Sequence, residues 1–312
     1  MKRTKVILSI VLTSVLSLSV LLTGCKDATP QANNSRIDVV TTIFAPYDFT
    51  RQIAGDNADI ILLVEPGSNV HEYSPTQEDI ETIKNADIFV YVGGDSEPWI
   101  NDVLNEVDIT KVKLIPMLAC SETVTASQPL GQGVEGEQYD EHVWTSTNNV
   151  KRVVSNITTA CADVDPERGE MYRSNADKYY EELNSLDAEV RAVAESSARK
   201  VIVVGDQNPF RYFTQEYGLQ CFSVFGSCSD KAEADENMVN SLIDKVQDEE
   251  IPVVFYKELS DQQLAQRIAS PSEKIILELH SCEGVSQEDF DNGETFVSLM
   301  KKNVVALALA LN

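Results

Sequence analysis

Two sets of short apolar segments, each alternating with helical patterns, constrain the fold of this chain more than any other feature. The first set is rich in β-branched residues and comprises residues 37–43, 58–67, 86–94 and 111–117. Apolar runs of this length are typical of strands that are buried on both faces of a parallel sheet. Helical patterns separate them at residues 45–55, 74–86 and 97–107. This alternation predicts an α/β lobe.

A second set with the same pattern follows in the C-terminal part of the chain. Its apolar runs comprise residues 200–206, 219–226, 251–259 and 274–282. Its helical patterns comprise residues 211–218, 236–250, 260–270 and 296–312. No strong sequence repeat relates the two halves, so the symmetry is one of pattern only. The second set predicts a second α/β lobe.

Residues 166–199 separate the two sets and form one long amphipathic pattern. Its apolar residues recur at helical steps and are Tyr172, Ala176, Tyr179, Tyr180, Leu183, Leu186, Val190 and Val193. The pattern predicts one helix of roughly 30 residues, about 45 Å long, which is enough to bridge two lobes. We therefore expect two parallel-sheet α/β lobes, residues 37–165 and 200–312, joined by a long backbone helix over residues 166–199.

One segment of the first lobe lacks any apolar period. Residues 120–141 are small, polar and acidic, which predicts a long exposed loop. The helical pattern of residues 145–165 follows it, with Ser146 or Thr147 as the expected cap.

The N-terminus has the features of a bacterial secretory signal. Lys2, Arg3 and Lys5 precede an apolar run that ends in Leu-Thr-Gly-Cys, with the cysteine at position 25. The last four residues resemble a lipobox, and this resemblance implies cleavage before Cys25 and its acylation. Residues 1–24 are then a lipoprotein signal peptide, and residues 25–36 are a polar tether. The alternative is a plain transmembrane anchor, since the apolar run is about long enough to span a bilayer.

The charge of the chain limits its partners. The net charge is −25, with 50 acidic and 25 basic residues. Loss of the basic signal residues would make the mature chain still more acidic. So acidic a surface argues against nucleic acid and favours either cations or simple solubility.

Five cysteines lie beyond Cys25, and none forms a Cys-x-x-Cys pair. A structural zinc site of the knuckle kind is therefore not expected. Because the number is odd, at least one thiol is free or pairs elsewhere. Cys228 and Cys282 both follow expected strands of the second lobe, and outside the cytoplasm their pairing is a plausible hypothesis.

The three histidines of the chain all stand where a ligand site is expected. His71 and His142 follow expected strands of the first lobe, and His280 ends an expected strand of the second. In open α/β sheets, ligands bind beyond the carboxyl ends of the strands. Imidazole is the commonest metal ligand among side chains, and zinc sites combine three or four nitrogen, sulfur or carboxylate ligands. The placement predicts a metal site.

Two carboxylates end strands of the second lobe and could supply an oxygen ligand. Asp206 ends the segment 200–206, and Glu258 lies near the end of 251–259. Asp206 has the alternative roles of a salt bridge to Arg211 or a loop cap. Glu258 could instead place its charge at the N-terminus of the following helix.

The motifs around these histidines resemble those of the substrate-binding proteins of zinc/manganese ABC transporters, over residues 37–312. PGSNVHEYSPT, which contains His71, is similar to the family's first ligand motif, and DEHVW, which contains His142, is similar to its His-x-Trp motif. The family's usual third histidine is absent from GDQNPFRYFTQEYGL, where Asp206 stands nearest. His280 stands in LELHSCEG, where the family usually has an aspartate.

The resemblance implies a ligand set of three imidazoles and one carboxylate: His71, His142, Asp206 and His280, with Glu258 as the substitute for Asp206. It implies two lobes that close over the ion. Zinc suits this set, while manganese favours more oxygen ligands and stays open as an alternative.

The same resemblance implies a function. We expect a monomeric metal receptor, not an enzyme, that is lipid-anchored on the extracytoplasmic side of the cell membrane. It would deliver Zn(II), or Mn(II), to an ABC permease. One alternative is a secreted metallohydrolase, but no His-Glu-x-x-His motif occurs. The other is a receptor for a non-metal ligand, such as a siderophore, on the same two-lobed frame.

Overall fold

The computed structural model describes residues 36–124, 139–226 and 234–312, and residues 36–312 form one compact unit. The expected signal peptide, Cys25, the expected tether up to residue 35 and Cys228 lie outside the described residues, as does most of the expected loop 120–141. No helix of the described residues has the length and apolar content needed to cross a bilayer.

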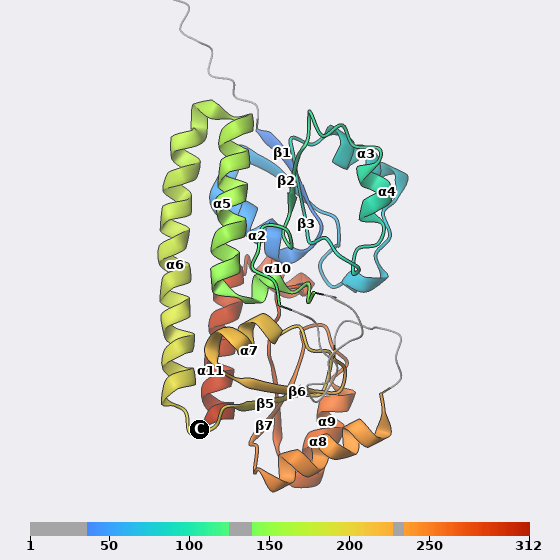
Figure 1. The fold of residues 1–312 in the computed structure, drawn as a ribbon, viewed down its shortest axis with the longest axis vertical. Helices are drawn as coiled ribbons and strands as arrows, with labels where there is room; N and C mark the ends of the chain where they lie inside the picture. The colour runs from blue at the N-terminus through green and yellow to red at the C-terminus, as the bar shows by residue number, and fades with distance from the viewer. Residues whose placement is uncertain (1–35, 125–138, 227–233) are drawn as a thin grey trace, which may run out of the picture. The chain divides into compact units, whose positions relative to one another are not determined.

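The first lobe is built on a parallel sheet with the strand order β2-β1-β3-β4 (Figure 1). The strands are β1 (Ile37–Thr41), β2 (Ala58–Leu62), β3 (Ile88–Tyr91) and β4 (Lys113–Pro116). The central strand β3 is buried throughout, as its apolar sequence predicts. The helices of this lobe are α2 (Phe44–Ala54), α3 (Gln77–Asn85), α4 (Ile100–Leu104) and α5 (Thr147–Val164).

The second lobe repeats this arrangement with the order β6-β5-β7-β8, again all parallel. Its strands are β5 (Val201–Val204), β6 (Gln220–Ser223), β7 (Val253–Tyr256) and β8 (Ile275–Glu278). Its helices are α7 (Arg211–Tyr217), α8 (Glu236–Asp248), α9 (Gln263–Ala269), α10 (Gln287–Asp291) and α11 (Phe296–Leu311). The predicted pair of parallel-sheet α/β lobes is confirmed.

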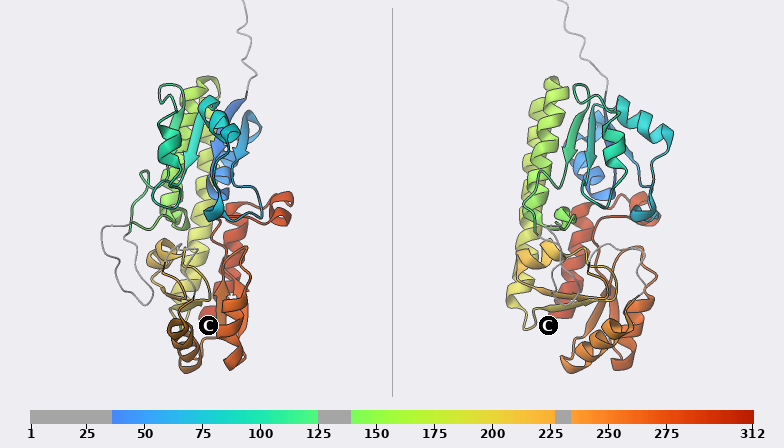
Figure 2. Two further views of the ribbon diagram at one scale, coloured as in Figure 1. Left: turned by 90° about the vertical axis from the view of Figure 1, so that its right-hand side faces the viewer. Right: turned by 45° about the vertical axis from the view of Figure 1, so that its right-hand side comes forward.

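The predicted long helix is α6 (Gly169–Ser196), which follows a 3-10 turn at Pro166–Arg168. It buries one face, and this face includes most of the predicted apolar positions: Tyr172, Ala176, Tyr179, Leu183, Leu186 and Val190. Figures 1 and 2 show α6 running beside α5 in the first lobe and α11 in the second. Ser146 caps α5 by accepting a hydrogen bond from the Asn149 amide, which is one of the two expected caps.

The two lobes share one hydrophobic core. A single cluster of buried side chains extends from β1 through α2, α5 and α6 to α11, and each lobe has one smaller cluster on the other face of its sheet. The start of α11 contacts α2 directly, because the Phe296 amide donates to Asp48 and the Phe296 ring meets Phe49 edge-on at 5.1 Å. The C-terminal helix therefore belongs to the packing of both lobes.

The structure corrects one prediction about the cysteines. Cys282 is a free thiol that is fully buried in the shared core, so the expected Cys228–Cys282 disulfide is wrong. Its side chain is used for apolar packing, as is common for a free cysteine.

Candidate metal centre

His71 reaches the cleft from a short 3-10 turn at Val70–Glu72, beyond the carboxyl end of β2. The turn is fixed by Asn69, whose side chain accepts a hydrogen bond from the His71 amide at 3.1 Å. The imidazole is nearly buried, and its Nε2 lies 3.3 Å from Oε1 of Glu283 in the second lobe. His71 thus contacts a carboxylate from the opposite lobe.

His142 is held from behind by a carboxylate of its own loop. Asp140 Oδ1 lies 2.9 Å from His142 Nδ1 and also accepts a hydrogen bond from the His142 amide. A carboxylate at Nδ1 favours the tautomer with its proton there, which leaves Nε2 available as a metal ligand. That Nε2 points toward Glu283 Oε1 at 3.8 Å.

Asp140 is buried, and residues of the second lobe surround it. The Tyr212 hydroxyl donates to the Asp140 carbonyl at 2.6 Å, and Arg211 Nε lies 3.6 Å from Asp140 Oδ2. The orientation of His142 therefore depends on contacts with α7.

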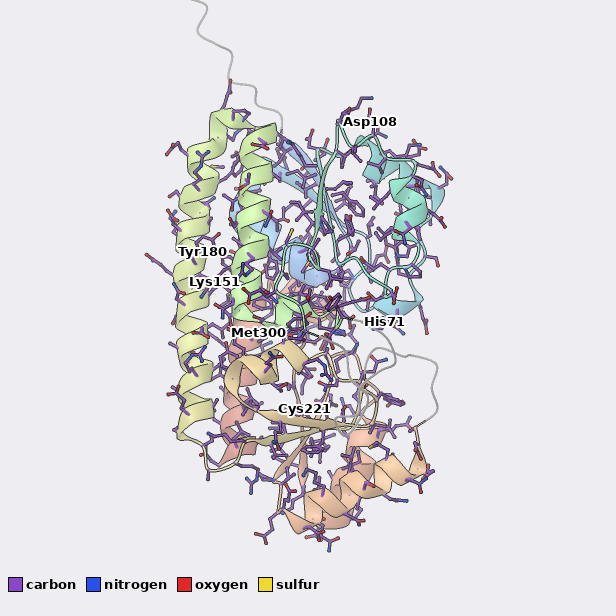
Figure 3. The ribbon with its side chains drawn as sticks, in the orientation of Figure 1. His71, Asp108, Lys151, Tyr180, Cys221 and Met300 are labelled. Carbon is purple, nitrogen blue, oxygen red and sulfur yellow. The ribbon has the colours of Figure 1, made fainter. Side chains whose placement is uncertain are left out.

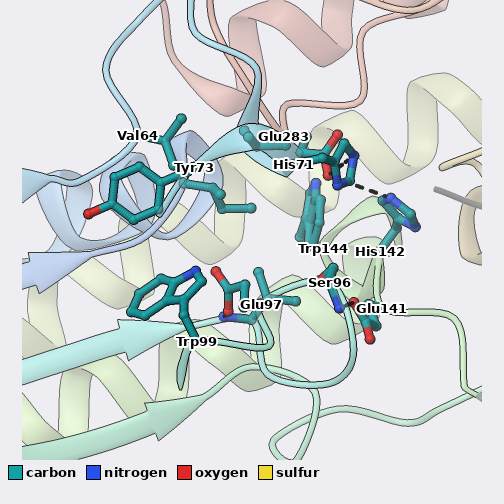
Figure 4. A pocket seen from close by; sticks show the side chains of 13 residues that line it. Val64, His71, Tyr73, Ser96, Glu97, Trp99, Glu141, His142, Trp144 and Glu283 are labelled. Carbon is teal, nitrogen blue, oxygen red and sulfur yellow. Dashed lines mark hydrogen bonds and ion pairs between the residues drawn. The ribbon is translucent and has the colours of Figure 1, made fainter. Parts of the chain in front are cut away.

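Glu283 lies at the point where the two imidazoles meet (Figure 4), and it was not among the predicted ligands. Its carboxylate is almost completely buried; Oε1 faces the histidines, and Oε2 accepts a bond from Lys257 Nζ at 2.8 Å. Burial opposes ionisation, but Lys257 and the two imidazoles outweigh it and hold the pKa of Glu283 well below its usual range. Glu283 is thus an ionised carboxylate in a buried site.

Glu258, the alternative oxygen ligand, holds the loop that carries Glu283. Its carboxylate accepts hydrogen bonds from the Ser281 amide at 2.7 Å and the Ser281 hydroxyl at 2.5 Å. The amides of Glu283 and Gly284 also donate to it. With both oxygens used in this way, Glu258 orients the loop.

His280 has a different environment from the other two histidines. Its Nδ1 accepts a bond from the Cys282 amide at 2.9 Å, and its backbone is paired with the Asn303 side chain in both directions. The nearest carboxylate in an ion-pair contact is Glu258, at 3.9 Å from Nδ1. Within the described residues, Nε2 of His280 has no hydrogen-bond partner. The structure therefore directs the His280 ring toward its own loop, while His71 and His142 converge on Glu283.

Asp206 follows β5, and its carboxylate accepts a bond from the amide of the next residue, Gln207. It lines a cleft of about 440 Å³ together with His71, Lys257 and Glu283. Asp206 therefore lies in the same cleft as the convergent site.

A small cavity of about 20 Å³ adjoins this cleft and is lined by His71, His142, Glu283, Glu97 and Trp144, among others (Figure 4). This volume suffices for one water-sized particle. In Figure 3, His71 is labelled at the level where the first lobe meets the second. The Trp144 indole donates to the Ser281 carbonyl at 2.8 Å, which ties the two sides of the cavity together.

The side chains of His71, His142 and Glu283 are close together but do not have the spacing of ligands that already surround a metal ion. Among the described residues, no three histidine, cysteine, aspartate or glutamate side chains are already spaced as the ligands of one metal ion. Small adjustments of His71, His142 and Glu283 would be needed, because Glu283 Oε1 itself lies between the two imidazoles.

Glu283 carried a sequence signal of its own. It lies in LELHSCEG, three residues after His280, and is the acidic residue of the loop that follows the last strand. The resemblance placed a carboxylate ligand in this region, but only the folded loop distinguishes Glu283 from His280.

The fold and the convergent side chains define a class: a two-lobed solute receptor with nitrogen and carboxylate donors between its lobes. Within this class, the chain belongs to the family described as ZnuA, zinc-uptake complex component A, periplasmic, whose model matches residues 39–310.

Characterised relatives agree with this assignment. The chain is 30% identical over 308 residues to the zinc-binding lipoprotein AdcA of Streptococcus pneumoniae (strain ATCC BAA-255 / R6); the match covers 96% of this chain and 60% of that protein. It is 28% identical over 282 residues to the high-affinity zinc uptake system protein ZnuA of Bacillus subtilis (strain 168), with 88% of each chain covered. The chain thus spans less than two thirds of the length of the streptococcal relative.

Solved structures show the same architecture. The Zn(II)-bound ZnuA-like domain of Streptococcus pneumoniae AdcA matches with a TM-score of 0.74 at 29% identity, covering 89% of this chain and 99% of that domain. The lipoprotein YcdH from Bacillus subtilis, described as metal-dependent, also matches with a TM-score of 0.74 at 29% identity, covering 88% of this chain and 99% of that one.

Proposed function

We propose that this chain is a metal receptor that binds one Zn(II) ion between its lobes and delivers it to an ABC-type permease for import. The observation that carries the proposal is the convergence of two imidazoles from the first lobe on one buried carboxylate of the second, at 3.3 and 3.8 Å. The names of the relatives, which describe zinc binding and zinc uptake, support the same function.

The proposed ligands are His71, His142 and Glu283. Two nitrogen donors and one carboxylate suit zinc, which takes four ligands in tetrahedral geometry, and a water molecule or a further side chain completes many such sites. Asp206 lines the adjoining cleft and is the proposed source of a fourth donor. His280 ranks lower, because its ring contacts its own loop.

Zinc is favoured over manganese by the donor atoms. Manganese prefers sites that are richer in oxygen. The convergent set has two nitrogens to one carboxylate, so zinc fits better, and manganese is the competing cargo in the experiment below.

The proposed location follows from the N-terminal sequence. Acylation of Cys25 would tether a monomeric receptor to the extracytoplasmic face of the cell membrane. Bacteria that express the chain can be grown in medium that contains a labelled fatty acid. The wild-type chain should then become labelled, and the Cys25→Ser variant should not. Equal labelling of both would remove the lipid anchor from the proposal.

Isothermal titration calorimetry of the purified, metal-stripped chain tests the binding function. We expect about one equivalent of zinc to bind, with manganese binding more weakly. His71→Ala and His142→Ala should each weaken zinc binding by more than about 100-fold, since loss of a ligand should exceed the effect of losing a residue that supports one. Wild-type affinity in both variants would exclude this site.

A further inference from the structure

We propose that Lys257 is a tethered counter-ion that competes with the metal ion for Glu283 and thereby lowers the affinity of the receptor and speeds release of its cargo. This inference rests on the proposed function. It concerns a residue that sets affinity by acting on a ligand and is not itself a ligand.

The contacts of Lys257 place its ammonium on the metal-binding carboxylate. Lys257 follows β7 directly, and its Nζ lies 2.8 Å from Glu283 Oε2 and 3.3 Å from Gln207 Oε1. Its side chain is only 14% exposed, and that of Glu283 is 5% exposed. One carboxylate therefore faces two imidazoles through Oε1 and an ammonium through Oε2.

Because Lys257 and Glu283 are both largely buried, their charges should have a large effect on the affinity for a metal ion. A buried carboxylate without a compensating cation is costly, so Lys257 stabilises Glu283 when no metal is bound. A zinc ion on the same carboxylate would lie within a few ångströms of the ammonium. Because like charges repel strongly where water is excluded, binding must either move Lys257 away or accept the repulsion. Both alternatives reduce the net affinity for the ion.

The cleft offers Lys257 an alternative position. Asp206 and Asp261 line the same cleft as Lys257 and Glu283. The lysine stem is flexible, and its charge is a compact point that needs no fixed geometry. Movement of the ammonium toward these carboxylates would free Glu283 for the metal, and its return would help to expel the ion.

Lys257→Met tests this role. We expect zinc affinity to rise by about tenfold or more, since close buried charge pairs couple at least this strongly. We also expect the transfer of zinc to a competing chelator to slow. The melting temperature of the metal-free variant should fall, because Glu283 loses its partner, while the rise on adding zinc should be larger than in the wild type.

A matched control separates this effect from a general change of charge. Lys301→Met removes one positive charge from the second lobe and breaks an ion pair with Glu189 that is about half exposed. Exposed pairs contribute little, so its zinc affinity should stay within about twofold of the wild type. If Lys257→Met does not fold, Lys257→Gln keeps a hydrogen-bond donor for Glu283 without the charge and should show the same rise in affinity.

The outcomes distinguish the two proposals. If the wild type binds zinc and neither uncharged Lys257 variant binds it more tightly, the counter-ion role is wrong and the receptor function stands. If the wild type binds no zinc at all, the proposed function fails first.

Discussion

The two lobes have the same strand order but contribute different chemistry to the cleft. The first lobe contributes two imidazoles, His71 and His142, whereas the second contributes a carboxylate and an ammonium, Glu283 and Lys257. The nitrogen donors and this carboxylate–ammonium pair thus come from opposite sides. Neither lobe alone holds the convergent set, so the proposed binding of an ion requires both.

The lobes also differ at one equivalent backbone position. Directly after the first strand of each sheet, an amide donates to the neighbouring strand: Thr42 to Val90 in the first lobe and Gly205 to Phe255 in the second. A side chain at Gly205 would overlap the backbone of Ala265 in α9. The second lobe therefore packs a helix against its sheet where the first lobe accommodates a threonine.

The comparison of Glu283 with His280 gives the largest expected effect. Glu283→Gln should weaken zinc binding by more than about 100-fold, since it removes the only carboxylate that meets both imidazoles among the described contacts. His280→Gln should change the affinity by less than about threefold. Calorimetry of both variants checks this, and the reverse ranking would restore His280 as the ligand of the second lobe.

A fall in pH should protonate the imidazoles of the first lobe before it protonates Glu283 of the second lobe. Imidazoles must be neutral to bind a metal, whereas the depressed pKa of Glu283 keeps it ionised. Lowering the pH from about 7.5 to about 5.5 should therefore weaken zinc binding, because protons compete with the metal ion for the ring nitrogens. Proton release on binding, measured in buffers of different ionisation enthalpy, should rise as the pH falls.

The folding stability of the metal-free chain should respond to acid differently from zinc binding. A carboxylate with a depressed pKa stabilises the folded chain above its unfolded value and loses that contribution only as the pH falls through the folded value. Glu283 should therefore cost the metal-free chain no stability between pH values of about 7.5 and 5.5. A fall in melting temperature over this range that is absent in Glu283→Gln would contradict this assignment.

Asp140 is the supporting residue whose removal should matter most. Asp140→Asn removes the charge behind His142 Nδ1 and disturbs the contact with Arg211 of the second lobe. Loss of such a supporting carboxylate typically costs 10- to 100-fold in metal affinity, and we expect about tenfold. Asp59→Asn, at an exposed ion pair with Arg36, is the control and should bind zinc like the wild type.

The change with the smallest expected effect on zinc binding concerns stability alone. Gly205→Ala should lower the free energy of unfolding by about 3 kcal/mol, because the new methyl group would overlap the backbone of Ala265. Gly169→Ala, where the added carbon meets only ordinary contacts at the start of α6, should be neutral or slightly stabilising. Urea denaturation of both variants would measure the difference, and equal stability would show that α9 can move.

The sequence was sufficient to predict the architecture because its signals are local. Buried parallel strands appear as apolar runs, and the face of α6 appears in the spacing of residues such as Tyr172 and Leu183. The five-residue helix α10 was missed, since it is too short to show a period and depends on its Ser286 cap.

The candidate site was less accessible from sequence, because it depends on how one loop folds. Between His280 and Glu283 the chain passes through Cys282 with φ of 62°, and Glu258 binds the amides that follow β8. These contacts come from residues more than 20 positions away and decide which side chain faces the first lobe. Cys282 itself is fully buried and is a free thiol.

The shared hydrophobic core limits how cargo can be exchanged. A large hinge opening of the two lobes would separate side chains that pack continuously from β1 to α11 and would expose them to water. The helices α6 and α11 would have to bend or slide for this to happen. Loading and unloading should therefore proceed through the loops around the cleft, with the scaffold nearly stationary. The proposed permease would then act on the loops at the rim of the cleft, and not by opening the two lobes about a hinge.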